Sequence, residues 1–473
     1  MRATLAAFLL AAAPAAAAPS GSGERPPAGD RGPLAAAARE ARGVLEELVR
    51  ADTSNPPGNE GRAVDIGAKR LKERGIPFEV TEFAPGRKNL TARLPGSGKE
   101  KPLLLLAHTD VVGADGQDWE SDPHTLVEKD GYLIGRGVLD DLSMAAVELQ
   151  VFLLLHSSKA RLRRDVILAW TGDEESGGLG ALYLLKEKPR SIEAGLALNE
   201  GGGPVLGEDG SVRFVDLQVA EKVYQDFELT ASGKTGHSSV PLEDNAIVRL
   251  SRALARAGSA RFPARLLPAT RAYFAARAAV EPPERARAMR DLSAASGALP
   301  EDALRVLEAD PVTSALLRTT CVPTLVSGCN RVNSLPAEAK ANINCRILPD
   351  ESVAAVREQL TAAIGDGSIA ITPVGELGSS GPTPADGDAV DAVRKTVRRF
   401  WPGAAVIPSL SLGATDSRHL RAAGIPSYGL HPVAVREEDD RRAHGIGERI
   451  PADGLRRGVE FLHALVLELA GER

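Results

Sequence analysis

Four consecutive leucines at positions 103–106 are followed by Ala107-His108-Thr109-Asp110. A short apolar run between a proline and a polar turn predicts a strand buried on both faces, as in parallel or mixed sheets. Open α/β sheets bind ligands at the carboxyl ends of their strands, which is where His108 stands. Since alternate residues of a strand face the same way, Asp110 is expected to turn toward His108 and hold its imidazole.

Two further apolar strands and one helix are flanked by acidic residues. The run at 165–170 leads into Thr171-Gly172-Asp173-Glu174-Glu175, and the run at 194–198 leads into Asn199-Glu200. A helix predicted from about 142 to 156 follows Asp140-Asp141. Neighbouring carboxylates repel each other unless a cation neutralises them, although acids at a helix start are also explained by capping and the helix dipole.

These acids and His108 are expected at one rim of the sheet, because they follow strand ends or open the next helix. One histidine with several carboxylates suits a hydrolytic zinc site with mixed oxygen and nitrogen ligands. The acids outnumber what one Zn²⁺ requires, so the pattern favours two metals sharing a bridging carboxylate. The carboxylates concerned are Asp110, Asp140, Glu174, Glu175 and Glu200.

The remaining periodicity predicts an α/β catalytic domain with a mixed sheet, interrupted by a second domain. Helical patterns at 34–49 and 60–74 and an edge hairpin at 78–83 and 90–94 precede the leucine strand. From residue 224 the order of strands and helices becomes βαββαβ, which is ferredoxin-like. The predicted domains are a catalytic domain in two parts, 34–222 and 379–473, and an inserted domain at 223–378 with a helical insertion at about 259–320.

Composition limits the partners. The chain has 473 residues, so two or three domains are expected. Its net charge of −6 does not predict a polybasic surface that would bind nucleic acid. Cys321, Cys329 and Cys345 allow at most one intramolecular disulfide, and we expect them in the core of one small domain.

The first 20 residues have the pattern of a secretory signal peptide. Arg2 precedes an apolar run at 5–13, which is too short to span a bilayer, and small residues at 15–18 offer cleavage sites. Residues 21–33 are rich in Gly and Pro and predict a flexible leader. The mature protein is therefore expected in the periplasm or outside the cell, without a membrane anchor.

Five motifs resemble the co-catalytic zinc family of aminoacylases, carboxypeptidases and dipeptidases, which includes glutamate carboxypeptidase and succinyl-diaminopimelate desuccinylase. Each is weak alone, but all five occur in the family's order over nearly the whole mature chain. They are His108-Thr109-Asp110, Gly135-Arg136-Gly137-x-x-Asp140-Asp141, Asp173-Glu174-Glu175-Ser176-Gly177-Gly178, Glu200-Gly201-Gly202 and His444-Gly445-x-x-Glu448. The nearest branch resembles N-acyl-amino-acid hydrolases and carboxypeptidase S.

The resemblance implies a role for each rim residue. Asp140 would bridge two zinc ions, with Co²⁺ or Mn²⁺ as alternatives. His108 and Glu200 would complete one site, and Glu175 and His444 the other. Asp110 would orient His108. Glu174 would be the general base, since a carboxylate free of metal is needed to move the proton.

In the inserted domain the resemblance implies a lid that forms a homodimer. His237 resembles a histidine that stabilises the oxyanion, often across the dimer interface. Asn333 and Arg346 resemble substrate-binding positions, and an arginine suits a substrate carboxylate. Two departures stand out: Leu142-Ser143 replaces a frequent Lys-Gly, and His431 competes with His444 as the late ligand.

The sequence therefore predicts an exported zinc hydrolase that cleaves an amide bond next to a free carboxylate, in an N-acyl-amino acid or a short peptide. A dipeptidase or aminopeptidase-like specificity is the alternative within the family. A non-catalytic periplasmic binding protein is the alternative outside it, and the presence of Glu174 with all five ligands disfavours it.

Overall fold

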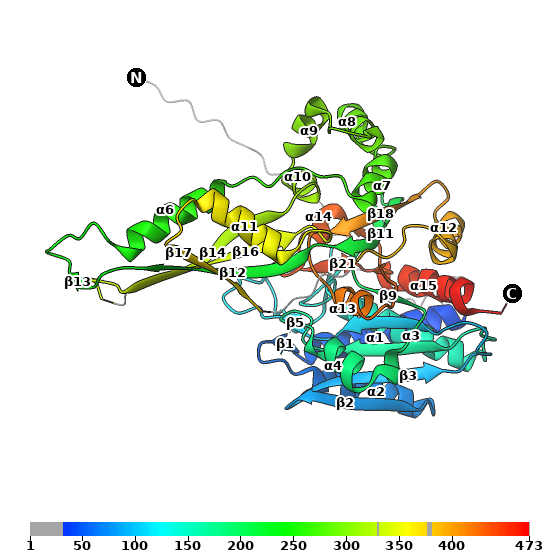
Figure 1. The fold of residues 1–473 in the computed structure, drawn as a ribbon. Coiled ribbons are helices and arrows are strands. Elements are labelled where there is room, and N and C mark those ends of the chain that lie inside the picture. The colour runs from blue at the N-terminus through cyan, green and yellow to red at the C-terminus, as the bar shows by residue number, and fades with distance from the viewer. Residues whose placement is uncertain (1–31, 329–330, 376–380, 473) are drawn as a thin grey trace, which may run out of the picture.

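The computed structural model describes residues 32–328, 331–375 and 381–472. The predicted signal peptide, nearly all of the predicted leader and Cys329 lie outside these ranges. Figure 1 shows a large sheet with its helices, a lid that extends to one side, and a group of helices, α7 to α10, beside the sheet. In the described part of the chain, no helix combines the length and apolar character that crossing a membrane requires.

The large sheet has ten strands and is mixed, as predicted. Its central strands β4, β8 and β9 run parallel, so their carboxyl ends meet at one edge. Every residue of β4 and β8 is buried, as expected for uninterrupted apolar runs. The order is β2 (Phe78–Ala84), β3 (Arg87–Leu94), β8 (Val166–Thr171), β4 (Leu103–His108), β9 (Leu196–Asn199), β19 (Ser427–Gly429), β11 (Val212–Glu221), β10 (Gly203–Leu206) and β20 (Val435–Arg436), with β18 (Ala405–Ser411) beside β11.

Helices cover both faces of this sheet. On one face α3 lies between the sheet and two outer helices, and its sequence is apolar on all sides because all sides are buried. On the other face apolar residues of β4 and β8 pack against Leu184, Ile192 and Leu420 from short helices. The helices are α1 (Pro33–Arg50), α2 (Glu60–Glu73), α3 (Leu142–Ser157), α4 (Leu179–Glu187), α5 (Pro189–Ile192), α12 (Asp388–Phe400), α13 (Ser417–Ala422), α14 (Glu437–Asp440) and α15 (Gly454–Ala470).

The lid is a four-stranded antiparallel sheet with two helices and a core of its own. Along the chain it comprises β12 (Val223–Ser232), α6 (Ala246–Ser259), β14 (Thr320–Ser327), β16 (Glu338–Ile347), α11 (Val353–Ile364) and β17 (Ile369–Val374), which is the predicted βαββαβ order. A disulfide joins Cys321 and Cys345 across β14 and β16. At the far end of the lid, β13 (Gly236–His237) pairs with β15 (Ser334–Leu335) (Figure 1).

The helical insertion packs differently from our expectation. We assigned residues 259–320 to the lid domain, but Phe274, Met289 and Leu307 belong to the hydrophobic core of the catalytic domain. The first insertion helix packs on β18 of the large sheet. The insertion helices are α7 (Pro268–Arg277), α8 (Pro283–Ala294), α9 (Glu301–Glu308) and α10 (Pro311–Leu316).

Candidate active site

Two clusters of potential metal ligands meet at the carboxyl edge of the parallel strands. In the first, His108 Nε2 lies 2.9 Å from Asp140 Oδ1 and 3.6 Å from Glu200 Oε2. In the second, His444 Nε2 lies 3.1 Å from Asp140 Oδ2 and 3.0 Å from Glu175 Oε2. The two oxygens of Asp140 therefore face two different histidines, which is the arrangement of a bridging carboxylate.

The donor atoms fit divalent cations. The carboxylates of Glu175 and Glu200 each have one oxygen that is shielded from solvent and has no hydrogen-bond partner among the described residues. Buried polar atoms without partners are costly, and a cation between these carboxylates would satisfy them. Mixed nitrogen and oxygen ligands without thiolates suit zinc.

Burial and mutual repulsion shift the pKa values of the cluster. Burial, followed by the charge of Glu200, raises the pKa of Glu174 well above its usual value. Burial also raises the pKa of Glu200 to about 7. Hydrogen bonds to Asp140 and Glu175 raise the pKa of His444 to about 10. These shifts have a common cause, because several acidic groups crowd a buried rim.

Asp110 acts on the rim in a way that strand alternation did not predict. Because β4 ends at His108, the Nδ1 atom of that ring faces the backbone carbonyl of Asp110 at 2.9 Å, with the carboxylate 3.6 Å away. The fully buried carboxylate instead accepts the backbone N–H groups of Glu174 and Glu175, each at 3.1 Å, and the amide of Asn55 at 2.8 Å. Asp110 thus positions both the predicted base and a predicted ligand.

Glu448 fixes the loop that carries the bridging carboxylate. Its oxygens accept the backbone N–H groups of Gly137, Leu139 and Asp140 at 2.8–3.0 Å. The same carboxylate pairs with Arg136 at 2.7 Å, and both side chains are 1% exposed. In the sequence, Glu448 stands out only as part of a motif. Its contact with this loop could not be predicted, because the two are more than 300 residues apart.

A buried ion network supports the turn that carries Glu174. Arg87 pairs with Glu60 and with Asp173, the latter at 2.6 Å, and Glu60 also accepts the backbone N–H of Asp173 at 3.1 Å. Asp173 adopts a positive φ of 69°, which these bonds hold in place. The role of Glu60 and Arg87 was not predicted, because no local pattern in the sequence links them to this turn.

The predicted lid residues fall into two places. His237 and Asn333 are exposed and lie together on the β13–β15 ribbon, where the carbonyl of Asn333 accepts the Ser238 N–H. Figure 1 shows this ribbon at the end of the lid that points away from the large sheet. Arg346 lies at the other end of β16, with its guanidinium 4.6 Å from the centre of the Tyr224 ring, and electrostatic coupling to Glu174 and Arg418 places it near the rim.

His431 lies beside the metal-ligand clusters, while His444 supplies the ligand atom. The His431 ring bonds to the Ser143 hydroxyl at 3.2 Å and lies 3.7 Å from Asp141. Burial lowers the pKa of His431 to about 4. Ser143, one of the two departures from the family pattern, is therefore the partner of this histidine.

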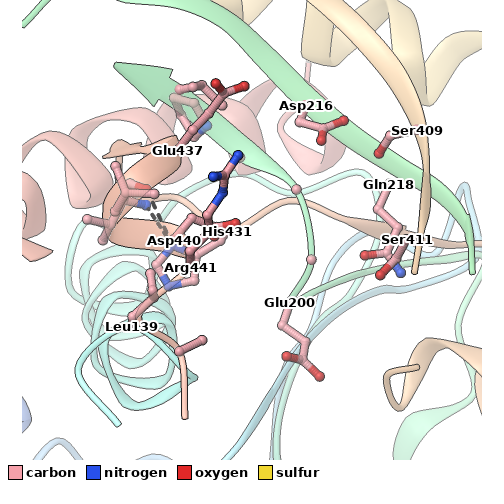
Figure 2. A pocket seen from close by; sticks show the side chains of 18 of the residues that line it. Leu139, Glu200, Asp216, Gln218, Ser409, Ser411, His431, Glu437, Asp440 and Arg441 are labelled. Atoms are coloured by element: carbon pink, nitrogen blue, oxygen red, sulfur yellow. Dashed lines mark hydrogen bonds between the residues drawn. The ribbon is translucent and has the colours of Figure 1, made fainter. Parts of the chain in front are cut away.

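A cavity of about 440 Å³ opens from the rim into the catalytic domain. Asp140 and Glu200 line one end, and Tyr273 and Arg277 of α7 line another part. Figure 2 shows its lining side chains, with Asp216 beside Ser409 and Glu200 at a distance from them. The insertion that we had placed in the lid thus forms part of a pocket next to the metal ligands.

Comparison with known proteins identifies the family. The pattern of peptidase family M20/M25/M40 matches residues 104–468. Human N-fatty-acyl-amino acid synthase/hydrolase PM20D1 is 29% identical over 375 residues, which cover 77% of this chain and 74% of the relative. Mouse aminoacylase-1 is 26% identical over 443 residues, covering 90% and 94%.

Solved structures show the same fold. The M20 family metallo-carboxypeptidase Sso-CP2 from Sulfolobus solfataricus superimposes with a TM-score of 0.66 at 19% identity, covering 90% of this chain and 98% of that one. Human carnosine dipeptidase 1 also gives 0.66, at 17% identity, covering 92% and 98%.

The chain belongs to peptidase family M20/M25/M40. It is a hydrolase of this family, and the expected resemblance and fold class are confirmed.

Proposed function

We propose that this protein is an exported two-zinc hydrolase that cleaves an amide bond next to a free carboxylate. The observation that carries the proposal is the position of Asp140, whose two oxygens face His108 and His444. Glu174 Oε1 has no hydrogen-bond partner among the described residues and is therefore open to a proton. The names of the relatives PM20D1 and aminoacylase-1 support N-acyl-amino acids as the substrate class.

His108, Asp140 and Glu200 would hold one cation, and Asp140, Glu175 and His444 the other. Two bound cations would supply Lewis acidity and a water of lowered pKa. Glu174 Oε1 then takes a proton from the attacking water and gives it to the departing amine nitrogen. Asp110 holds the backbone of Glu174 so that the carboxylate stays in reach of both positions.

Arg346 would bind the free carboxylate of the substrate. Its guanidinium is half-buried against Tyr224 and is electrostatically coupled to Glu174. Arg418 is a nearby cation, and burial together with its charge lowers the pKa of Arg346. A planar guanidinium favours a bidentate carboxylate.

His237 would act across a homodimer. Within one chain it lies at the far end of the lid, so it would reach a metal centre of a second copy. Strand β14 is an edge of the lid sheet, and its Val322, Leu325 and Val326 are 58–71% exposed. Exposed apolar edge strands readily pair with another chain. A monomer in light scattering would exclude action in trans.

Export is supported by the apolar start of the sequence and by the disulfide. Cys321–Cys345 requires an oxidising compartment to persist, such as the periplasm or the exterior. Fractionation with amino-terminal sequencing tests this: a mature chain starting near residue 20 is expected, and a cytoplasmic full-length chain would contradict it.

The deciding experiment measures amine release from a panel of N-acyl-amino acids, dipeptides and amino-terminally blocked peptides. Activity is expected with zinc, to be lost on chelation and to return with metal. The same panel separates an acyl-amino-acid hydrolase from a dipeptidase, since only the latter requires a free amino group. Metal binding without release from any substrate would contradict the proposed reaction.

A further inference from the structure

The cavity beside the metal centre carries a feature that the proposed reaction does not use. Asp216 on β11 lines it, and its Oδ1 atom is shielded from solvent without a hydrogen-bond partner among the described residues. Burial raises the pKa of Asp216 to about 6, so the carboxylate is still mostly ionised at neutral pH. A buried charge without a full set of partners is costly unless a ligand completes it.

The positive charge nearest to Asp216 is largely committed elsewhere. Arg277 donates to Glu281 and to Glu437, each at 2.6 Å, and stacks 4.2 Å from the centre of the Phe214 ring. The Ser409 hydroxyl lowers the pKa of Asp216 through a hydrogen bond, which leaves Oδ1 open. The surroundings thus provide one neutral donor and a cation that two other carboxylates already neutralise.

The wall of the cavity has charged groups and an apolar stretch. Six acids and three arginines line it, and two of the acids are the metal-ligand candidates Asp140 and Glu200. Phe214, Tyr273 and Leu410 provide the apolar surface. Such a wall suits a methylene chain that ends in a positive group. The methylenes would pack on the apolar part, and the positive group would bind the carboxylate of Asp216.

The cavity is separate from the proposed carboxylate subsite. No residue of the four lid strands in the described chain lines it, whereas Arg346 lies on lid strand β16. A substrate that places its carboxylate at Arg346 and its amide at the metals therefore directs its acyl group toward the cavity. This orientation rests on the proposed function.

We propose that the cavity is the subsite for the acyl side of the substrate, and that Asp216 selects acyl groups whose flexible chain ends in a primary ammonium. Asp216 is a specificity-determining residue here, not a catalytic one. The head group donates to Oδ1, and α7 of the insertion closes the wall around the chain.

The test compares two matched substrates, aminohexanoyl-methionine and heptanoyl-methionine, whose chains differ only in a terminal ammonium or methyl group. The zinc-loaded wild type is expected to hydrolyse the amine with a kcat/KM at least about tenfold higher, as one charged hydrogen bond supplies. Asp216→Asn should remove this preference and change the heptanoyl substrate little. Asp209→Asn, in an exposed turn, is the control and should retain the preference.

Calorimetric titration of the holoenzyme with the two acid products, aminohexanoate and heptanoate, gives a readout independent of turnover. Tighter binding of the amine to the wild type, lost in Asp216→Asn, is expected. Equal hydrolysis of both substrates, or an equal loss for both in the variant, would overturn the subsite while leaving the proposed function intact. No metal-dependent hydrolysis of either substrate would overturn the proposed function, and the subsite with it.

Discussion

The rim of the catalytic sheet and the far end of the lid present predicted site residues in opposite ways. At the rim the side chains are mostly buried, and Asp110 alone accepts hydrogen bonds from Asn55, Glu174 and Glu175. At the lid end His237 is exposed and bonds to Ser239, two residues away. A single chain therefore preorganises its candidate metal-ligand clusters, whereas the role proposed for His237 at the lid end requires a second copy of the chain.

The largest expected effect comes from replacing Glu174, the proposed general base. Glu174→Gln should lower kcat by about 10²–10⁴-fold, because the amide cannot accept the proton from water. Bound zinc, measured by elemental analysis, should stay unchanged since Glu174 is not assigned as a ligand. Glu187→Gln, the same change at an exposed helix position, should keep full activity. Retained turnover in Glu174→Gln would show that another group moves the proton.

The next effect tests the lid end. His237→Ala should lower kcat by about 10²–10³-fold, as expected for loss of one oxyanion donor, while zinc content stays unchanged. The control His156→Ala removes an exposed histidine from α3 and should have no such effect.

Co-expression of differently tagged His237→Ala and Glu174→Gln chains sharpens this test. In a two-fold dimer one of the two mixed sites regains both residues, so the purified heterodimer should recover activity that neither homodimer has. A dead heterodimer would place His237 and Glu174 of the same subunit in one site.

The third effect concerns the contribution of the buried Glu448–Arg136 pair to stability. Glu448→Gln leaves Arg136 buried with its charge unpaired, so the free energy of unfolding should fall by about 3–5 kcal/mol in urea denaturation. Glu460→Gln breaks a partly exposed pair with Arg456 and should cost at most about 1 kcal/mol. A similar small loss for both variants would contradict the assignment of Glu448 as the support of the Asp140 loop.

The smallest effect is expected at the base of the lid. Arg346→Lys keeps the charge but loses the planar fork, so KM for an N-acyl-amino acid should rise roughly tenfold with little change in kcat. Arg357→Lys, on the exposed side of α11, is the matched control. An unchanged KM would show that the substrate carboxylate binds elsewhere.

The sequence was most informative where a single local pattern decides the structure. Buried parallel strands read as continuous apolar runs, so β4, β8 and β9 could be predicted together with the acids that follow them. The order of strands and helices likewise predicted the lid, because each of its elements has its own clear periodicity. The short strands β6 (Val127–Lys129), β7 (Tyr132–Ile134) and β21 (Arg449–Pro451) were missed, because three residues are too few to show a clear alternation. β6 and β7 pair with each other across a two-residue turn, and β21 joins β7 from far along the chain.

The sequence by itself determined which chemical groups gather at the rim, because strand ends and helix starts carry them in fixed order. Only the tertiary structure decided what holds them: Glu448 meets the Asp140 loop, and Arg87 meets Asp173, through contacts between segments far apart in the chain. It also decided that the insertion packs on the catalytic sheet and lines a cavity with Asp216. Local periodicity specifies an element and its buried face, but the partner of that face is set by packing across the whole domain.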